Sequence, residues 1–223
     1  MLPVCPPFDE LLPWGGLRRG STIGADSRSV GFTLIAEATR AGSWAAMVGV
    51  PAAGLAAAAE LGVELERLAI VSTPPVELAA TVIAALVDAV DLVLVGPQVV
   101  LRPAEIRRLT SRVRERGAVL IPVGQGVWPE GLDARCRIVN NRWVGLERGH
   151  GVLTGRQVEI EVEGRRAAAR PRRAWCWLQG GPGPRWHDAD APADAPTDVL
   201  ADSLADSLAE SSSTAALVVA RAG

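Results

Sequence analysis

The sequence predicts an α/β fold with a mainly parallel sheet and helices on both faces. Two observations support this class. Short, continuous apolar runs alternate with longer segments of helical periodicity between residues 21 and 123, as in parallel sheets buried on both sides. Hydrophobic residues make up 48% of the 223 residues, which indicates a chain able to bury a substantial core.

The elements follow one another in a regular order. We expect strands at residues 21–24, 44–50, 68–71, 92–95 and 119–123. We expect helices at 29–41, 55–61, 76–88 and 103–116. Ser27 or Ser29 is suited to cap the first helix, and Pro103 and Gly117 are typical of the ends of the last. Short strands at 137–140, 143–146 and 158–162, separated by glycine turns, predict antiparallel strands at the carboxyl-terminal end of the domain.

Composition divides the chain into a core domain, residues 1–178, and a tail, residues 179–223. A Pro/Gly-rich stretch at 180–184 opens the tail as a linker. Residues 187–210 then carry seven acidic residues and no arginine, in an acidic, low-complexity segment that we expect to be disordered. Leu200, Leu204 and Leu208 are spaced i, i+4 and i+8, so they would form one stripe if the tail folded as a helix on a partner.

Several kinds of chemistry are excluded or disfavoured. All 23 basic residues are arginine, so no lysine ammonium can bind a phosphate or form a Schiff base. The three cysteines are far apart in the sequence and only two histidines exist, so we expect no metal site and no cofactor. No apolar run reaches about 18 residues, and the first ten residues lack a basic stretch. We therefore expect a cytoplasmic protein without a membrane span.

A set of motifs, taken in order, resembles the RecA recombinase family. Leu61-Gly-Val-Glu-Leu-Glu-Arg-Leu-Ala-Ile-Val71 is similar to that family's entry into its third strand, and Val90 to Gly96 is similar to its Walker B strand. Within the family, Leu12-Pro-Trp-Gly-Gly16, Ala41-Gly-Ser-Trp44 and Trp143-x-Gly-Leu-x-x-Gly-His-Gly151 most resemble the short actinobacterial ImuA-type proteins. The resemblance covers residues 8 to 178 and implies a RecA-like P-loop NTPase fold.

The departures from the family predict a degenerate nucleotide site without catalysis. A phosphate loop needs the pattern GxxxxGK[ST], whereas this chain reads Gly24-Ala-Asp-Ser-Arg-Ser-Val-Gly-Phe-Thr33. Gly96 stands where the Walker B carboxylate belongs, and Pro51 lies where the catalytic glutamate is expected. The degenerate site comprises Gly24, Ser29, Gly31, Phe32, Thr33, Pro51 and Gly96. Because phosphoryl transfer depends on positioning and charge, we expect no ATPase activity and no catalytic residue.

The ImuA-type resemblance implies an accessory role in the SOS response to DNA damage. The implied function is a scaffold in SOS mutagenesis by translesion synthesis. The partners would be an ImuB-type homologue of Y-family polymerases and, through it, an error-prone replicative-type polymerase and the sliding clamp. A cell-division inhibitor resembling the SulA group is a further alternative, because that group shares a RecA-derived ancestry.

A basic segment rich in tryptophan is the main candidate for contacts with a partner or with DNA. Its arginines could contact phosphates while its indoles stack on unpaired bases, so a single-stranded-DNA-binding recombinase relic is the runner-up function. The alternative is a solvated basic edge whose tryptophans pack on the sheet or on a partner. The candidate residues are Arg165, Arg166, Arg170, Arg172, Arg173, Trp175 and Trp177. Trp14 and Trp128, beside glycine and proline, are further candidates for exposed anchors.

Overall fold

The computed structural model describes residues 1–50, 54–124, 128, 131–147, 150–179 and 186–187. All of them belong to one compact unit, Met1–Ala191. Pro51, the leucines at 200, 204 and 208, and nearly all of the predicted tail lie outside the described residues. The disorder predicted for the tail therefore stays a prediction.

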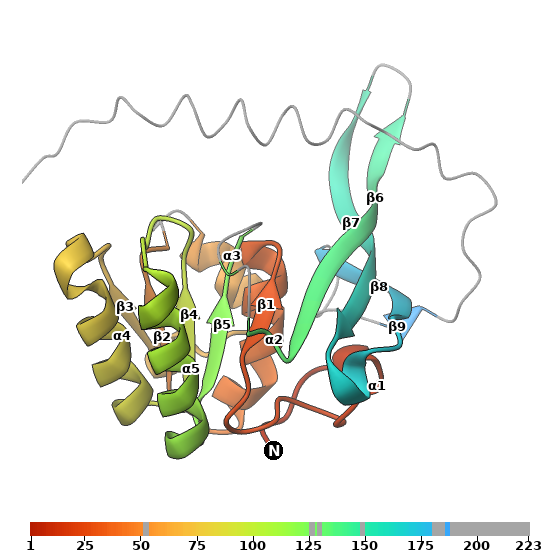
Figure 1. The fold of residues 1–223 in the computed structure, drawn as a ribbon. Helices are drawn as coiled ribbons and strands as arrows, with labels where there is room; N and C mark the ends of the chain where they lie inside the picture. The colour runs from red at the N-terminus through yellow and green to blue at the C-terminus, as the bar shows by residue number, and fades with distance from the viewer. Residues whose placement is uncertain (51–53, 125–127, 129–130, 148–149, 180–185, 188–223) are drawn as a thin grey trace, which may run out of the picture. The chain divides into compact units, whose positions relative to one another are not determined.

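The centre of this unit is a parallel sheet. Its strand order is β3 (Leu68–Val71), β2 (Ala45–Val48), β4 (Leu92–Val95) and β5 (Val119–Pro122). β1 (Ile23–Ala25) continues the sheet beyond β5 through parallel bridges from Thr22 to Leu120 and from Ala25 to Val123 (Figure 1). These strands lie where the apolar runs predicted them.

A second sheet begins at the same strand β1. Its order is β1, β6 (Ala134–Glu147), β7 (His150–Gly164), β8 (Arg172–Gln179) and β9 (Trp186–His187). β6 runs parallel to β1, and every later pairing is antiparallel. The predicted mixed α/β class, with a mainly parallel sheet followed by antiparallel strands, is therefore confirmed.

The antiparallel part differs from the prediction in its strand lengths. The segments expected at 137–140 and 143–146 belong to one strand, β6, because β-bulges between Ile138 and Asn140 and between Val144 and Leu146 carry the pairing through the polar residues. The basic segment is also largely strand, since β8 pairs with β7 from Arg172 onward. The bulges interrupt the alternation along β6, so sequence periodicity could not reveal the full length of that strand. In β8 the residues from Ala174 to Leu178 alternate regularly, and the prediction missed this strand signal.

Four helices cover the two faces of the parallel sheet. α2 (Arg28–Arg40) and α3 (Leu55–Glu60) lie on one face, and α4 (Val76–Ala89) and α5 (Pro103–Arg116) on the other. This division follows from the strand order, because right-handed crossovers that move in opposite directions along a sheet place their helices on opposite faces. A short helix, α1 (Phe8–Leu11), and two 3₁₀ turns, η1 (Leu65–Arg67) and η2 (Arg166–Ala168), complete the described elements.

The ends of the helices follow the predicted local signals. Ser27 caps α2 by accepting a hydrogen bond from the Val30 amide at 3.3 Å. Pro103 is the first residue of α5, and Gly117 ends that helix in the left-handed conformation with φ of 71°. None of the helices in the described part of the chain is both long and apolar enough to cross a membrane.

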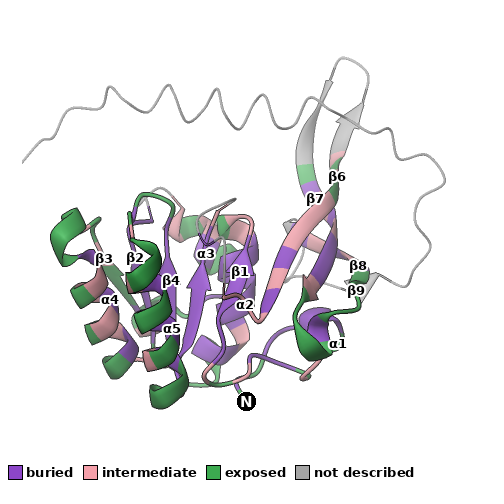
Figure 2. Ribbon diagram, in the orientation of Figure 1, coloured by how far each residue is buried: buried purple, intermediate pink, exposed green. Residues whose placement is uncertain are grey.

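The core lies on both sides of the sheet. Leu94 packs with the α2 side, whereas its neighbours Val93 and Val95 pack with the α4–α5 side, as successive residues of a strand must. Figure 2 shows the central strands buried throughout. The prediction that Trp128 is an exposed anchor is wrong: its side chain is 2% exposed within the α5-side core. Trp14, the other predicted anchor, is half-buried against the α2-side core.

Candidate functional site

The carboxyl ends of the parallel strands are where open α/β sheets bind ligands, so the predicted nucleotide site belongs there. The structure leaves only Asp26 and Ser27 between the end of β1 at Ala25 and the start of α2 at Arg28. Ser27 is bonded to the helix by both of its oxygen atoms: its hydroxyl accepts from the Val30 amide, and its carbonyl accepts from the Gly31 amide at 3.0 Å. A connection of this length cannot wrap around a phosphate.

The residues predicted to form a degenerate phosphate loop therefore lie in regular elements. Gly24 is inside β1, and Ser29, Gly31, Phe32 and Thr33 belong to the first turns of α2. Phe32 is only 4% exposed and belongs to the α2-side core. The Thr33 hydroxyl, which would hold a metal ion in a working loop, donates instead to the Ser29 carbonyl at 2.8 Å.

The two glycines of this segment allow close packing. A Cβ atom on Gly24 would lie 2.9 Å from Cδ1 of Leu132. A Cβ atom on Gly31 would lie 3.2 Å from Cγ2 of Val123, so apolar side chains already fill the space beside the helix. These glycines bring the strand and helix close to their neighbours and present no cavity to an anion.

Gly96, at the predicted Walker B position, is the most tightly enclosed of these residues. It follows β4 directly, and its amide donates to the Val48 carbonyl at 2.8 Å. A Cβ atom on Gly96 would lie 2.0 Å from the carbonyl oxygen of Gly49, which is main chain of the neighbouring connection. No carboxylate can occupy this position unless the backbone moves.

The charges at the start of α2 are mixed. Asp26 lies in the β1–α2 connection, and burial raises the pKa of its carboxyl, an effect that the nearby guanidiniums of Arg135 and Arg137 partly offset. A carboxyl group that precedes the positive end of a helix dipole disfavours a second anion there.

The basic segment has two distinct faces. Ala174, Cys176 and Leu178 of β8 are buried in the core, whereas Trp175 and Trp177 are half-buried on the opposite, outer face. The alternation is that of a strand with one covered side. The tryptophans therefore belong to the outer surface of the antiparallel sheet.

A row of charges crosses this outer face. Arg137 of β6, Glu161 of β7 and Arg173 of β8 are aligned by the strand register. Glu161 is 3% exposed, forms an ion pair with Arg137, and accepts from Nε of Arg173 at 2.6 Å. Hydrogen bonds from the Arg137 and Arg173 guanidiniums hold the pKa of the Glu161 carboxyl below its usual value. Arg173 is thus already neutralised.

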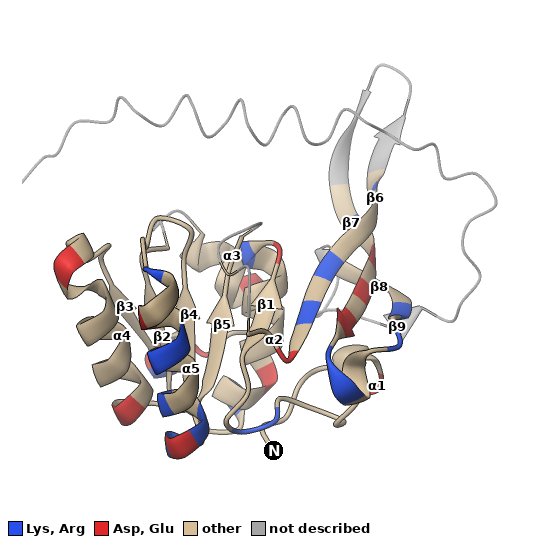
Figure 3. Cartoon of the chain, viewed as in Figure 1, with Lys and Arg blue, Asp and Glu red and all other residues tan. Residues whose placement is uncertain are grey.

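The remaining candidate arginines fall into two groups. Arg172 donates to the main-chain carbonyl of Glu10 at 2.9 Å and so ties β8 to α1. Arg165, Arg166 and Arg170 are exposed in the β7–β8 connection, and no ion pair involves them among the described residues (Figure 3). These three form the basic surface most available to an anion.

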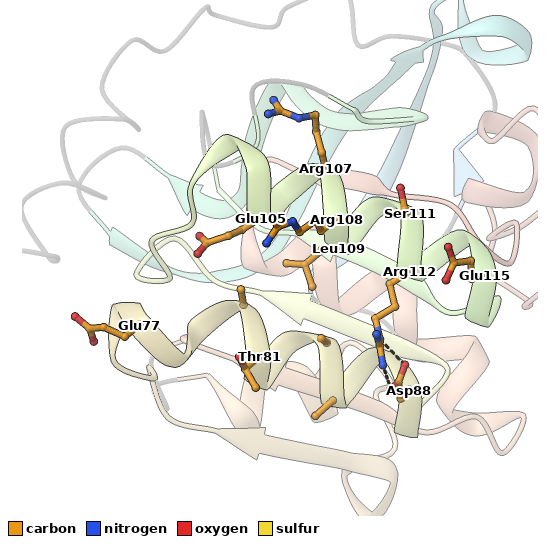
Figure 4. A pocket seen from close by; sticks show the side chains of 13 residues that line it. Glu77, Thr81, Asp88, Glu105, Arg107, Arg108, Leu109, Ser111, Arg112 and Glu115 are labelled. Atoms are coloured by element: carbon orange, nitrogen blue, oxygen red, sulfur yellow. Dashed lines mark hydrogen bonds and ion pairs between the residues drawn. The ribbon is translucent and has the colours of Figure 1, made fainter.

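One further surface feature, a groove between α4 and α5, has no signal in the sequence. Its volume is about 870 Å³, and Figure 4 shows Glu77, Thr81 and Asp88 along one side and Arg108 and Arg112 along the other. Asp88 accepts from Nε of Arg112 at 2.8 Å, which closes one end of the groove. No group of metal-ligating residues occurs there or elsewhere among the described residues.

Comparisons with known proteins identify a family for this chain, a relative in sequence and a solved structure with a similar fold. The family model of the MT3502 N-terminal domain matches residues 10–130. "Uncharacterized protein Rv3395c" of Mycobacterium tuberculosis is 40% identical over an alignment of 158 residues, and the match covers 65% of this chain and 74% of the relative. The flagellar accessory protein FlaH from Methanocaldococcus jannaschii shares the fold alone, at a TM-score of 0.54 and 10% identity over 82% of this chain and 95% of that chain. The matched segment contains the whole strand-and-helix series from β1 to β5, and the chain belongs to the MT3502 N-terminal domain family.

Proposed function

We propose that this chain is a non-catalytic accessory protein of translesion DNA synthesis, with a RecA-like core that serves as a scaffold. In this proposal it docks an ImuB-type homologue of Y-family polymerases and thereby reaches an error-prone replicative-type polymerase and the sliding clamp during the SOS response. The motifs shared with ImuA-type proteins suggest the role. The two-residue β1–α2 connection and the enclosure of Gly96 are the observations that support a role without nucleotide turnover.

This closure goes further than the loss of catalytic side chains. The β1–α2 connection of two residues has no room for a phosphate loop, and Gly96 cannot carry a carboxylate against the Gly49 carbonyl. The chain also contains no lysine that could neutralise a phosphate. The absence of the loop, of the lysine and of the metal-holding carboxylate removes three parts on which phosphoryl transfer depends, which supports the proposal.

The test is co-purification with the ImuB-type homologue encoded by the same genome. The full chain is compared with a version ending at Ala191, which retains the whole compact unit. Capture by the full chain and not by the shorter one would place the dock in the tail, and capture by both would place it on the core. Capture by neither would refute the scaffold. DNA-stimulated ATP hydrolysis, lost on Thr33→Ala substitution, would refute the absence of catalysis.

A single-stranded-DNA-binding relic is the second candidate, supported by the half-buried Trp175 and Trp177 and the exposed arginines of the β7–β8 connection. Because Arg173 pairs with Glu161, the informative variant replaces Arg165, Arg166 and Arg170 with alanine. A DNA-binding protein would lose affinity and have a shallower salt dependence in this variant. Arg107→Ala is the control, because Arg107 lies on α5. Binding that is absent or independent of salt would dismiss this candidate.

A further inference from the structure

In the described part of the chain, the outer edge of β3 is open. Among the described residues β3 pairs with β2 alone, and it is the last strand of the parallel sheet. The Val71 carbonyl accepts from the Gly49 amide of the β2 side at 3.1 Å. Because successive residues of a strand direct their main-chain groups to opposite sides, the N–H and C=O of Ile70 point away from β2 to the open side. An open edge of this kind is a template for another strand.

Apolar side chains lie on both faces of this edge. Ile70 is 47% exposed on the face of Leu68, which is the face covered by α2 and α3. On the other face, α4 carries Leu78, Val82 and Leu86 at i, i+4 and i+8, and Leu78 is 53% exposed. Because the groove toward α5 is lined by Glu77, Thr81 and Asp88, helical geometry puts these three apolar residues on the flank away from α5.

We call Ile70 of β3 and Leu78, Val82 and Leu86 of α4 together the β3 strip. Native proteins commonly protect edge strands with charge, proline or a covering helix, but β3 contains no charged residue and no proline. An incoming strand would direct alternate side chains to the two faces, toward Ile70 on one and toward Leu78 on the other. The complementary segment is therefore apolar on both faces.

The charges around the strip select among possible occupants. Glu64 and Glu66 precede β3, and Glu77 follows it; all three are exposed, and no ion pair involves them within the described part of the chain. The nearby Arg67 is engaged, since it donates to the Gly42 carbonyl at 3.0 Å and stacks on Trp44 at 5.3 Å. Antiparallel pairing of two β3 strands would bring the acidic ends of both copies together, which disfavours a second copy of this chain.

We propose that the β3 edge binds an extended apolar segment of another protein that carries basic residues at both ends. The main chain of Ile70 pairs with the segment, the β3 strip contacts its side chains, and Glu64, Glu66 and Glu77 attract its basic ends. This surface is distinct from the predicted contacts in the basic segment and the tail, and the proposal does not depend on the translesion function.

The test uses two labelled peptides and the full chain. One peptide is Lys-Arg-Val-Thr-Val-Ile-Val-Arg-Lys, and the other has glutamate at all four basic positions. We expect the basic peptide to bind, measured by fluorescence anisotropy, at least about tenfold more tightly than the acidic one. Hydrogen exchange should show new protection of the Ile70 amide, which faces the open side.

Three variants locate the binding. Ile70→Pro removes the outward N–H and the exposed Ile70 side chain, while proline is tolerated on an edge strand, so it should weaken binding of the basic peptide about tenfold. Ile70→Lys introduces a repelling charge and provides the same readout if the proline variant does not fold. Ala85→Lys is the matched control, because Ala85 is an exposed residue of α4 that lines the groove toward α5. It should leave binding unchanged.

The proposal is overturned if the two peptides bind equally, if neither binds, or if Ile70→Pro and Ile70→Lys have no effect. Sedimentation velocity of the wild-type chain tests whether a second copy of this chain occupies the edge. A dimer that Ile70→Lys dissociates would assign the edge to a second copy and would overturn the proposed partner. None of these results bears on capture of the ImuB-type homologue through the tail.

Discussion

The enclosure of Gly96 makes a quantitative prediction about the lost Walker B position. Gly96→Ala places a Cβ atom 2.0 Å from the Gly49 carbonyl oxygen and 2.9 Å from Cγ2 of Val50. The nearest atom is main chain and cannot rotate away, so the connection after β2 must shift to relieve the overlap. Overpacking of a core typically costs about 1–3 kcal/mol, and a main-chain obstacle should put Gly96→Ala at or above the upper end, about 3 kcal/mol. Gly96→Asp, which restores the carboxylate in sequence, should cost at least as much.

Urea unfolding followed by tryptophan fluorescence measures this effect, since the chain has seven tryptophans. A loss of about 3 kcal/mol would lower the Tm by roughly 6–12 °C in a domain of this size. Gly42→Ala is the control: that glycine has φ of 97°, but nothing would lie within 4 Å of an added Cβ atom, so only conformational strain of about 1–2 kcal/mol is expected. If Gly96→Ala unfolds like the wild type, or if Gly96→Asp binds a magnesium nucleotide, the closed site is refuted.

Three further predictions concern buried groups. Glu161→Gln should destabilise the fold by about 1–2 kcal/mol, since both guanidinium partners are partly exposed to solvent. Folding lowers the pKa of Glu161, so the stabilisation that this carboxylate contributes is fully present above the ordinary pKa of 4.5. It is lost as the pH falls through the lower pKa of the folded state. The stabilities of the wild type and the variant should therefore converge below that pH in acid unfolding. Trp128→Ala should cost about 3–5 kcal/mol in urea unfolding, whereas Trp44→Ala, at a residue 46% exposed, should cost far less; equal losses would contradict the assigned burial. Burial raises the pKa of the Cys5 and Cys176 thiols to about 12, so a thiol reagent at pH 8 should react only after denaturation, and rapid reaction of the native protein would argue against this packing.

The strands and helices of the parallel half of the molecule could be predicted from the local sequence. The strands at 68–71 and 92–95 and the helix at 103–116 have the predicted bounds. Each is defined by signals within a few residues: a continuous apolar run for a strand buried on both faces, Pro103 at a helix start, and Gly117 at its end. Such signals depend on the backbone preferences and the hydrophobicity of the residues themselves, and both are properties of the local sequence.

The antiparallel half was predicted less well because its order depends on register. The bulges in β6 shift the alternation at Val139, so apolar and polar residues no longer mark fixed faces. The pairing of Arg137, Glu161 and Arg173 joins three strands, and nothing in the local sequence of any one of them indicates it. The same limit explains Trp128, which was predicted to be an exposed anchor because it lies beside glycine and proline, whereas packing against α5-side residues buries it.

The amino-acid sequence was enough to establish the α/β class, the order of the parallel strands and helices along the chain, and the absence of lysine. The folded chain was needed to see that Gly24 and Gly31 serve close packing, that Gly96 is closed off by the Gly49 carbonyl, and that Ile70 lies on an open edge. The difference arises because helix caps and apolar runs are local properties of the chain. Steric enclosure, charge pairing and edge exposure depend instead on which distant segments meet across a sheet, and that is fixed by the packing of the whole domain.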